Sequence, residues 1–397
     1  MTKGARLDLY LHIGTEKTGT TSIQEFLRRN REILLAQGVE YPILPGPPNQ
    51  ICLATASLEE VHRSTQHLFD LHSRKDVIAF RGTVSAALSE ALAGSTGRTA
   101  ILSNEHCSSR LRHPADVETL HDMLRPFFDR MFIVVYLRRQ DEFLLSTYST
   151  AVKGGLRRPL SLPKAYGRDS RYDYWKLLSR WANVFGRDAI ICRKFERNAL
   201  KGGDVVEDFI QAAGLESDPA FEKPPNKNES LDAASLEFVR LMNEHISARS
   251  PLRHRLLEIL SKIGKGPLPT LPAEVFAEFM GGVRESNRKV AEEYFGGVQV
   301  DSDDPLFAPL NFSRPRVERS ELTLGEAVAI MARVWAEAND DVEDGLVDTA
   351  QSEATGRKRR KHRAASSSLT RAQRKKQRQE KRALARTESN TETPTAS

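Results

Sequence analysis

The chain has 397 residues, of which 39% are hydrophobic and 28% charged, and its formal net charge is +6. This is an ordinary globular composition, with length enough for a large core and additional segments. No run approaches about 18 apolar residues, which excludes a transmembrane helix. The three cysteines, Cys52, Cys107 and Cys192, are far apart, which excludes a disulfide scaffold and a cysteine-based zinc site. With no secretory signal in view, we expect a reducing, cytoplasmic location.

The positive charge is concentrated at the C-terminus. Residues 357–397 contain 14 Lys or Arg and 3 Asp or Glu, whereas residues 1–356 carry a net charge of −5. The basic segment is poor in hydrophobic residues, so we expect it to be disordered in isolation. Its charge suits nonspecific contact with nucleic acid or with an anionic membrane, which would add membrane association to the cytoplasmic location. A merely solvated tail is an equally good interpretation.

Strand and helix patterns alternate over the first 215 residues. The apolar, β-branched runs predict strands at Leu7–Ile13, Val39–Ile43, Thr99–Leu102, Met131–Leu137 and Ala189–Cys192. The amphipathic runs between them predict helices at Thr20–Ala36, Gln140–Val152, Tyr172–Phe185 and Val205–Ala213. This order predicts the α/β class, with a central parallel sheet flanked by helices.

The character of the chain changes after Leu215. A polar linker leads into a helical pattern over residues 230–296, broken by prolines, and a last helix is predicted at Leu322–Ala338. We therefore expect three parts: an α/β core over 1–215, a helical region over 216–340, and an acidic linker with the basic tail over 341–397.

The first strand leads directly into a glycine loop, Gly14-Thr15-Glu16-Lys17-Thr18-Gly19-Thr20-Thr21-Ser22, and then a helix. Such a loop aims backbone N–H groups and the positive helix end at one point, which suits a phosphate. The glycines have the spacing of a nucleotide triphosphatase loop, but the lysine is Lys17 inside the loop rather than after Gly19. The alternative is a Gly/Thr-rich turn whose hydroxyls only cap the helix.

A second candidate anion site follows the strand Met131–Leu137. Arg138 stands at the carboxyl end of this strand, where open α/β sheets place their ligands, and Ser146 lies eight residues on. A guanidinium and a nearby hydroxyl can hold one phosphate together. No acidic residue ends the strand, which argues against a magnesium site for ATP hydrolysis. Taken alone, Arg138 is better interpreted as a surface arginine, and the pair gains weight only in combination with the glycine loop.

Together the two motifs resemble those of the sulfotransferases that use 3′-phosphoadenosine 5′-phosphosulfate (PAPS). Lys17 to Thr21, continued by Ser22, look like their phosphosulfate loop, and Arg138 with Ser146 looks like their 3′-phosphate motif. The resemblance covers about residues 7–215 and implies a P-loop-like α/β fold. It also implies sulfuryl transfer from PAPS to a hydroxyl, releasing 3′-phosphoadenosine 5′-phosphate (PAP), without a metal.

One family feature is missing. The late Arg-Lys-Gly loop that covers the nucleotide in many members does not occur before the tail, where Arg357-Lys358 lacks the glycine. Ser286-Asn287-Arg288 is a substitute candidate. Residues 216–340 follow the nucleotide-binding core, so we expect this helical region to complete the fold and the acceptor cleft.

The candidate catalytic groups follow from this scheme. Lys17 would stabilise charge on the leaving phosphate. Glu105 and His106 follow the strand Thr99–Leu102, and either could act as the base toward the acceptor hydroxyl. Glu105 resembles the base of family members that act on sugars, so a carbohydrate or glycolipid acceptor is expected. The alternative for Glu105 is a solvated acid or an ion-pair partner of Lys17 or an arginine.

Other functions and contacts stay open. A P-loop kinase or NTPase shares the glycine loop, and a non-catalytic nucleotide-binding protein with an anion-binding tail would share both motifs. Trp175 and Trp181 are expected in the core, and Phe195 either packs in the core or touches the adenine.

Overall fold

The computed structural model describes residues 7–162, 171–225, 230–298, 304–309, 315–318 and 321–338. The chain divides into two compact units, Met1–Thr323 and Leu324–Ser397. In the second unit residues 324–338 are helical, close to the predicted helix Leu322–Ala338. The linker and basic tail predicted at 341–397, with Arg357-Lys358, lie outside the described residues.

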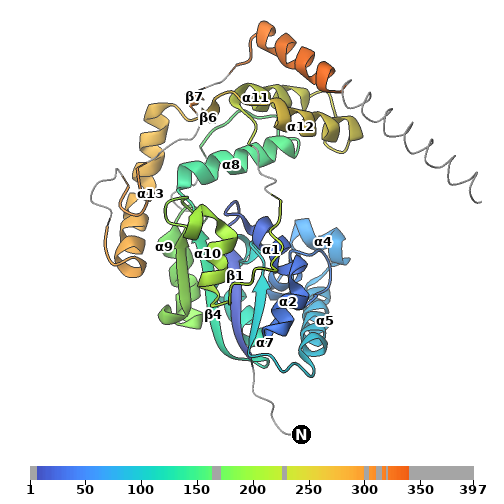
Figure 1. The fold of residues 1–397 in the computed structure, drawn as a ribbon, viewed down its shortest axis with the longest axis vertical. Coiled ribbons are helices and arrows are strands. Elements are labelled where there is room, and N and C mark those ends of the chain that lie inside the picture. The colour runs from blue at the N-terminus through green and yellow to red at the C-terminus, as the bar shows by residue number, and fades with distance from the viewer. Residues whose placement is uncertain are drawn as a thin grey trace, which may run out of the picture. The chain divides into compact units, whose positions relative to one another are not determined.

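A five-stranded parallel sheet forms the centre of the first unit (Figure 1). Its strand order is β2-β3-β1-β4-β5, with β1 Leu7–Gly14, β2 Val39–Glu40, β3 Thr99–Ser103, β4 Phe128–Leu137 and β5 Ile190–Lys194. All five predicted strands are confirmed, although β2 is shorter than expected. Pro42 explains its early end, since proline has no N–H for a sheet ladder.

Helices cover both faces of this sheet, as a parallel sheet requires. One face packs against α3 Cys52–Ser57, α5 Arg74–Leu92, α7 Pro114–Leu124 and α9 Tyr174–Phe185. The other packs against α1 Thr20–Arg29, α2 Arg31–Ala36 and α10 Val205–Ala212. Alternate residues of β1 serve the two faces: Leu9, Leu11 and Ile13 belong to the first core. The predicted fold class, a central parallel sheet flanked by helices, is confirmed.

The helix predicted over Thr20–Ala36 is two helices. Asn30 separates α1 from α2, and its side chain donates to the backbone oxygen of Phe26 and accepts from the N–H of Glu222 at 2.7 Å. A side chain that bonds backbone groups competes with the helix ladder, which explains the break. Trp181 is fully buried in the first core and Trp175 packs partly against it, as predicted.

Five further elements complete the described part of this unit before residue 216. They are α4 Arg63–Phe69, α6 His106–Arg110, α8 Gln140–Lys153, and the 3₁₀ turns η1 Arg187–Ala189 and η2 Lys201–Gly203. In Figure 1, α8 lies at the end of the sheet away from the marked N-terminus, which is the end where the parallel strands finish.

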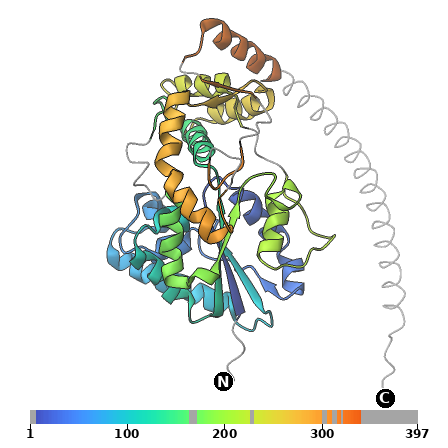
Figure 2. The same cartoon turned by 90° about the vertical axis from the view of Figure 1, so that its left-hand side faces the viewer.

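The region after residue 216 is mainly helical, as expected. It contains α11 Ala233–Met242, α12 Pro251–Ile263 and α13 Ala273–Tyr294, with a parallel pair of short strands, β6 Leu268–Thr270 and β7 Arg316–Glu318. Figure 2 shows the long α13 running beside α9, and Val290 and Ala291 join the same core as Trp181. Pro251 and Pro272 stand at the starts of α12 and α13, so they break the helical pattern as predicted.

Candidate active site

Most of the predicted site residues line one cavity of about 740 Å³. The eight that do so are Lys17, Gly19, Thr20, Thr21, Glu105, His106, Arg138 and Ser146. They follow the carboxyl ends of β1, β3 and β4, three adjacent strands of the sheet. Parallel strands finish at the same edge, so segments more than 100 residues apart in the chain meet there.

Thr18 and Ser22 do not line the cavity. The Thr18 side chain is buried and its hydroxyl donates to the Thr15 carbonyl oxygen at 2.6 Å, so it stabilises the loop. Ser22 lies in the first turn of α1, where its N–H donates to the Gly19 carbonyl. Neither residue is in the cavity lining, and their place in a phosphosulfate loop stays a prediction.

The glycine loop is held in a conformation that few residues adopt. Gly14, Lys17 and Gly19 have φ angles of 95°, 65° and 76°, in the left-handed region. A Cβ on Gly19 would lie 2.8 Å from Cγ1 of Val205, so only glycine fits there. Gly19 precedes the first residue of α1, and the loop therefore presents the helix N-terminus to the cavity.

The Lys17 ammonium is available to a ligand. It forms no hydrogen bond or ion pair with any residue that the structure describes. Burial lowers the pKa of Lys17, and the nearby charge of Arg138 adds to this, while Glu16 and Glu105 oppose it. A half-buried ammonium group that lacks a partner gains free energy from an anionic ligand.

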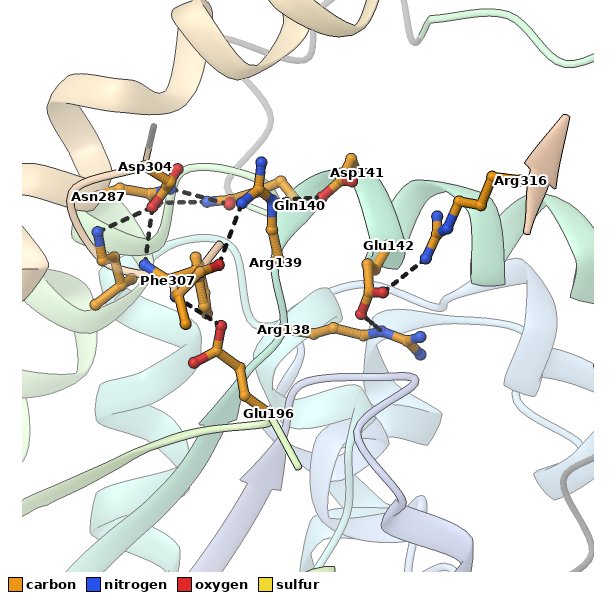
Figure 3. Close-up of polar contacts among 12 residues, drawn as sticks. Arg138, Arg139, Gln140, Asp141, Glu142, Glu196, Asn287, Asp304, Phe307 and Arg316 are labelled. Carbon is orange, nitrogen blue, oxygen red and sulfur yellow. Dashed lines mark hydrogen bonds and ion pairs between the residues drawn. The ribbon is translucent and has the colours of Figure 1, made fainter. Parts of the chain in front are cut away.

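Arg138 is fixed by three neighbours. Its Nη1 donates to the Lys17 carbonyl oxygen at 3.0 Å, its Nε lies 3.4 Å from Oε2 of Glu142, and its guanidinium lies 5.7 Å from the ring centre of Phe195. Figure 3 shows Glu142 between Arg138 and Arg316, whose Nη2 donates to it at 2.8 Å. Phe195 lines the cavity and also packs against the second core, so both of its interpretations stay open.

Glu105 and His106 form a second polar group in the cavity wall. Oε2 of Glu105 accepts a hydrogen bond from Nε2 of Gln24 at 2.7 Å, and Oε1 lies 3.8 Å from Nε2 of His106. The other His106 nitrogen, Nδ1, lies 3.0 Å from Oε1 of Glu16. His106 thus stands between two carboxylates. Among the residues described, Glu105 forms no ion pair with Lys17 or an arginine, the alternative considered for it.

Glu16 is held ionised by its neighbours. Burial acts to raise its pKa, but the hydrogen bonds from His106 and from the Ser109 hydroxyl outweigh burial and bring the pKa below its usual value. A carboxylate at this position orients the His106 ring.

The substitute predicted for the missing late loop is wrong. None of Ser286, Asn287 and Arg288 lines the cavity. Asn287 is fully buried and bonds Gln140 and Asp304 (Figure 3). Arg288 points to solvent and pairs with two glutamates of its own helix. These residues lie within α13, and Asn287 fastens this helix to its neighbours instead of contacting a ligand.

Several cavity residues were not found by sequence reasoning. They are Glu16, Glu142, Lys153 and Arg316, together with Gln24 behind Glu105. Glu142 and Lys153 share the face of α8 that bears Ser146, at spacings of four and seven residues, so helical periodicity could have found them. Arg316 comes from β7, and no pattern in the sequence connects it to the cavity.

The described residues hold neither a candidate metal cluster nor a candidate membrane span. No cluster of three or more His, Cys, Asp or Glu side chains suited to a metal ion occurs among them. No helix in this part of the chain has both the length and the apolar character needed to cross a bilayer.

Comparison with known proteins finds distant similarity. No family model matches the chain. An uncharacterised protein from Archaeoglobus fulgidus is 33% identical over 168 residues, which cover 41% of this chain and 46% of that protein. The chain thus spans about half the length of this relative.

Two solved structures resemble the fold at low identity. A sulfotransferase from Alicyclobacillus acidocaldarius is 20% identical, with a TM-score of 0.36, over 60% of this chain and 95% of that one. The sulfotransferase domain from the curacin biosynthetic pathway is 10% identical, with a TM-score of 0.31, over 70% of this chain and 99% of that one. Similarity at this level assigns no activity.

Proposed function

We propose that this chain is a sulfotransferase that moves a sulfuryl group from PAPS to a hydroxyl of a carbohydrate or glycolipid and releases PAP. The observation that carries the proposal is the meeting of Lys17, Arg138, Ser146 and Glu105 around one cavity. Lys17, Arg138 and Ser146 suit anions and Glu105 suits a proton, and sulfuryl transfer from a nucleotide needs both kinds of group.

The nucleotide would be held at both of its anionic groups. Lys17 and the N–H groups of Gly19, Thr20 and Thr21 would bind the 5′-phosphosulfate, as the exposed start of α1 favours. Arg138 and Ser146 would bind the 3′-phosphate. Because Arg138 donates to the Lys17 carbonyl, the two anion sites are held at a fixed separation. Phe195 would lie against the adenine or ribose.

The transfer step needs positioning and charge stabilisation. When bound, PAPS would supply an activated sulfuryl group. A bond forms between the acceptor oxygen and sulfur while the bond from sulfur to the 5′-phosphate oxygen breaks, and that oxygen keeps the electron pair. The Lys17 ammonium would stabilise the charge developing on it.

Glu105 would accept the proton of the acceptor hydroxyl. Its Oε2 is occupied by Gln24, which leaves Oε1 toward His106 and the cavity. His106 is the second candidate, since its Nε2 faces the same space while Glu16 fixes Nδ1. The Glu16–His106–Glu105 series could also carry the proton away from Glu105 after transfer.

The proposal is tested by calorimetric titration of the full chain with PAP and, separately, with Mg·ATP. We expect PAP to bind and Mg·ATP to bind far more weakly. A preference for Mg·ATP would favour a P-loop kinase or NTPase, and PAP binding without turnover of PAPS on any sugar or glycolipid would favour a non-catalytic nucleotide-binding protein.

The catalytic part is tested with Lys17→Ala. Formation of PAP from PAPS in the presence of sugar and glycolipid acceptors should fall by roughly 10²–10³-fold, the effect of removing a group that stabilises developing charge. Lys75→Ala, at an exposed lysine near the start of α5, is the matched control. Unchanged turnover in a folded Lys17→Ala protein would exclude the proposed role.

A further inference from the structure

The cavity continues along α8 beyond the proposed nucleotide site. Its lining includes residues that recur on one face of this helix: Glu142, Leu145, Ser146, Ser149, Thr150 and Lys153. At 1.5 Å per residue, Lys153 lies about 10 Å past Ser146 along the helix. The proposed nucleotide contacts end near Ser146, so this half of the cavity is open to another molecule.

The half of the cavity around Lys153 is bounded by hydroxyl and apolar side chains. With Lys153 it is lined by Ser149, Thr150, Ala151, Ser230, Leu231, Ser261, Leu268 and Pro269. Hydroxyls that bond sugar hydroxyls, beside apolar side chains that pack against a ring, suit a carbohydrate.

Two charged residues of the described lining border this half: Lys153, and Arg316, which pairs with Leu268 between β6 and β7 and is engaged by Glu142. The three carboxylates of the cavity lie elsewhere and are engaged: Glu16 by His106, Glu105 by Gln24, and Glu142 by two arginines. Lys153 forms no hydrogen bond or ion pair with the residues described. The arrangement leaves one half-buried positive charge without a counter-charge.

The electrostatic environment of Lys153 is unfavourable in the free protein. Burial lowers its pKa, and the positive charge of Lys17 lowers it further. A negative group placed beside Lys153 would offset both effects. The two ammonium groups are close enough to repel, so a group held by Lys153 lies near the point where Lys17 acts.

We propose that Lys153 binds an acidic group of the acceptor, so that the acceptor is an acidic carbohydrate bearing a carboxylate or a sulfate ester. The inference rests on the proposed function, because PAPS must occupy the Lys17 and Arg138 end for an acceptor to occupy this one. The donor does not need Lys153, since its two anionic groups are matched by the loop and by Arg138 with Ser146.

The test uses the full chain saturated with PAP and three glycosides: para-nitrophenyl glucuronide, the sulfate ester of para-nitrophenyl glucoside, and the neutral glucoside. Calorimetry should show at least one acidic glycoside binding about tenfold or more tightly than the neutral one, as expected for a charge-assisted hydrogen bond. The acidic glycoside that the wild type binds more tightly than the neutral one shows whether Lys153 binds a carboxylate or a sulfate ester.

Three variants define the role of Lys153. Lys153→Ala should remove the preference for the acidic glycoside and leave binding of PAP within about threefold, and Lys153→Arg should restore most of the preference. Lys176→Ala, at an exposed lysine of α9 outside the cavity lining, is the matched control and should behave as the wild type.

The proposal is overturned if the wild type binds acidic and neutral glycosides equally, if it binds none of them, or if Lys153→Ala keeps the preference. In these cases PAP still binds, so the proposed nucleotide site stands and only the acidic acceptor is excluded. Failure of PAP to bind the wild type would remove the proposed function, and this inference with it.

Discussion

Nη1 of Arg138 donates a hydrogen bond to the main-chain oxygen of Lys17 at 3.0 Å. This contact joins the two anion motifs, which lie 121 residues apart in the chain. Glu142 adds a second restraint on the guanidinium, and Arg316 balances the charge of Glu142 (Figure 3). A cation fixed before the ligand arrives loses little entropy on binding, so the site is preorganised for a phosphate.

Arg138→Ala should weaken PAP binding strongly. Removing a charge-assisted hydrogen bond to a phosphate costs about 2–3 kcal/mol, which is roughly a 30- to 150-fold rise in Kd. Arg138→Lys should recover only part of this, because an ammonium group lacks the fork that reaches Lys17 and the ligand together. Calorimetric titration with PAP measures both variants.

Arg288→Ala is the matched control for this prediction. Arg288 is a partly exposed arginine that pairs with Glu285 and Glu292 on α13 and does not line the cavity. Its loss should leave the affinity for PAP unchanged. Equal PAP affinities for the wild type and Arg138→Ala would show that the 3′-phosphate is bound elsewhere.

Substitutions at Glu105 and His106 distinguish the two candidate bases. Glu105→Gln keeps the hydrogen-bonding shape but cannot accept a proton, so kcat should fall by roughly 10²–10³-fold while PAP binding is retained. His106→Gln should lower kcat less, since Glu105 remains. Steady-state sulfuryl transfer measures both, and a larger loss for His106→Gln would reverse the assignment.

The site was partly visible in the sequence because its main residues follow strands. Lys17, Glu105 and Arg138 each come within four residues of the end of a β-strand, and parallel strands finish at a common edge. Local pattern therefore predicted which segments meet. It could not show that Gln24 reaches Glu105 from the second turn of α1, because that contact depends on how the helix packs on the sheet.

The fold shows the same division between local and distant effects. Apolar periodicity gave the five strands and placed α8, α9 and α10 within two residues. The break at Asn30 was missed because it depends on the backbone of Glu222, 192 residues away. Arg316 was missed for the same kind of reason, since only the pairing of β6 with β7 brings it to the cavity.

Gly14→Ala should disturb both the fold and the site. Gly14 has a φ of 95°, and an added Cβ would lie 3.0 Å from Cβ of Glu105 and 3.1 Å from its Cα. Strain of this kind lowers the free energy of unfolding by about 1–3 kcal/mol. Displacement of Glu105 should also lower kcat. Chemical denaturation and steady-state transfer measure the two effects.

Gly82→Ala provides the opposite expectation with the same chemical change. Gly82 lies inside α5, and an added Cβ there meets no atom within 4 Å. Alanine should raise the free energy of unfolding by about 0.5–1 kcal/mol. An equal free energy of unfolding for Gly14→Ala and the wild type would contradict the positive φ angle of Gly14.

His12 should make the fold sensitive to mild acid. His12 is part of β1 and its ring is fully buried. Its Nδ1 lies 2.8 Å from the Ser103 hydroxyl. Burial lowers the pKa of His12 to about 3. Below a pH of about 6.5 His12 is protonated in the unfolded chain but stays neutral in the folded chain. The contribution of His12 to the free energy of unfolding is therefore complete above this pH and is lost as the pH decreases toward 3.

The expected loss from His12 is about 2 kcal/mol between pH 7.5 and pH 5. Urea denaturation of the wild type and of His12→Gln at both pH values measures it, since glutamine does not titrate. The variant is less stable at pH 7.5 because the ring packs near Phe209, but it should lose less stability on acidification. An equal loss in both proteins would mean that other groups cause the acid sensitivity.

The basic C-terminal segment should account for any binding to polyanions. Residues 1–356 carry a net charge of −5 and are repelled by such partners, whereas 357–397 carry 14 Lys or Arg against 3 Asp or Glu. If six or more of these cations contact phosphates, affinity for single-stranded RNA should fall about 300-fold or more between roughly 50 and 200 mM salt. Titrating the full chain with single-stranded RNA and with anionic vesicles, at two salt concentrations, identifies the partner.

Deletion of 357–397 should abolish this salt-dependent binding and leave PAP affinity unchanged, because the proposed nucleotide contacts all lie before residue 147 apart from Phe195. Vesicles of neutral lipid should bind neither form, since the segment has few apolar residues to insert. If the full chain bound neither RNA nor anionic vesicles at low salt, the segment would be a solvated tail. A drop in PAP affinity on deletion would instead mean that its cations raise the local concentration of the anionic nucleotide, the long-range steering that clustered charge produces.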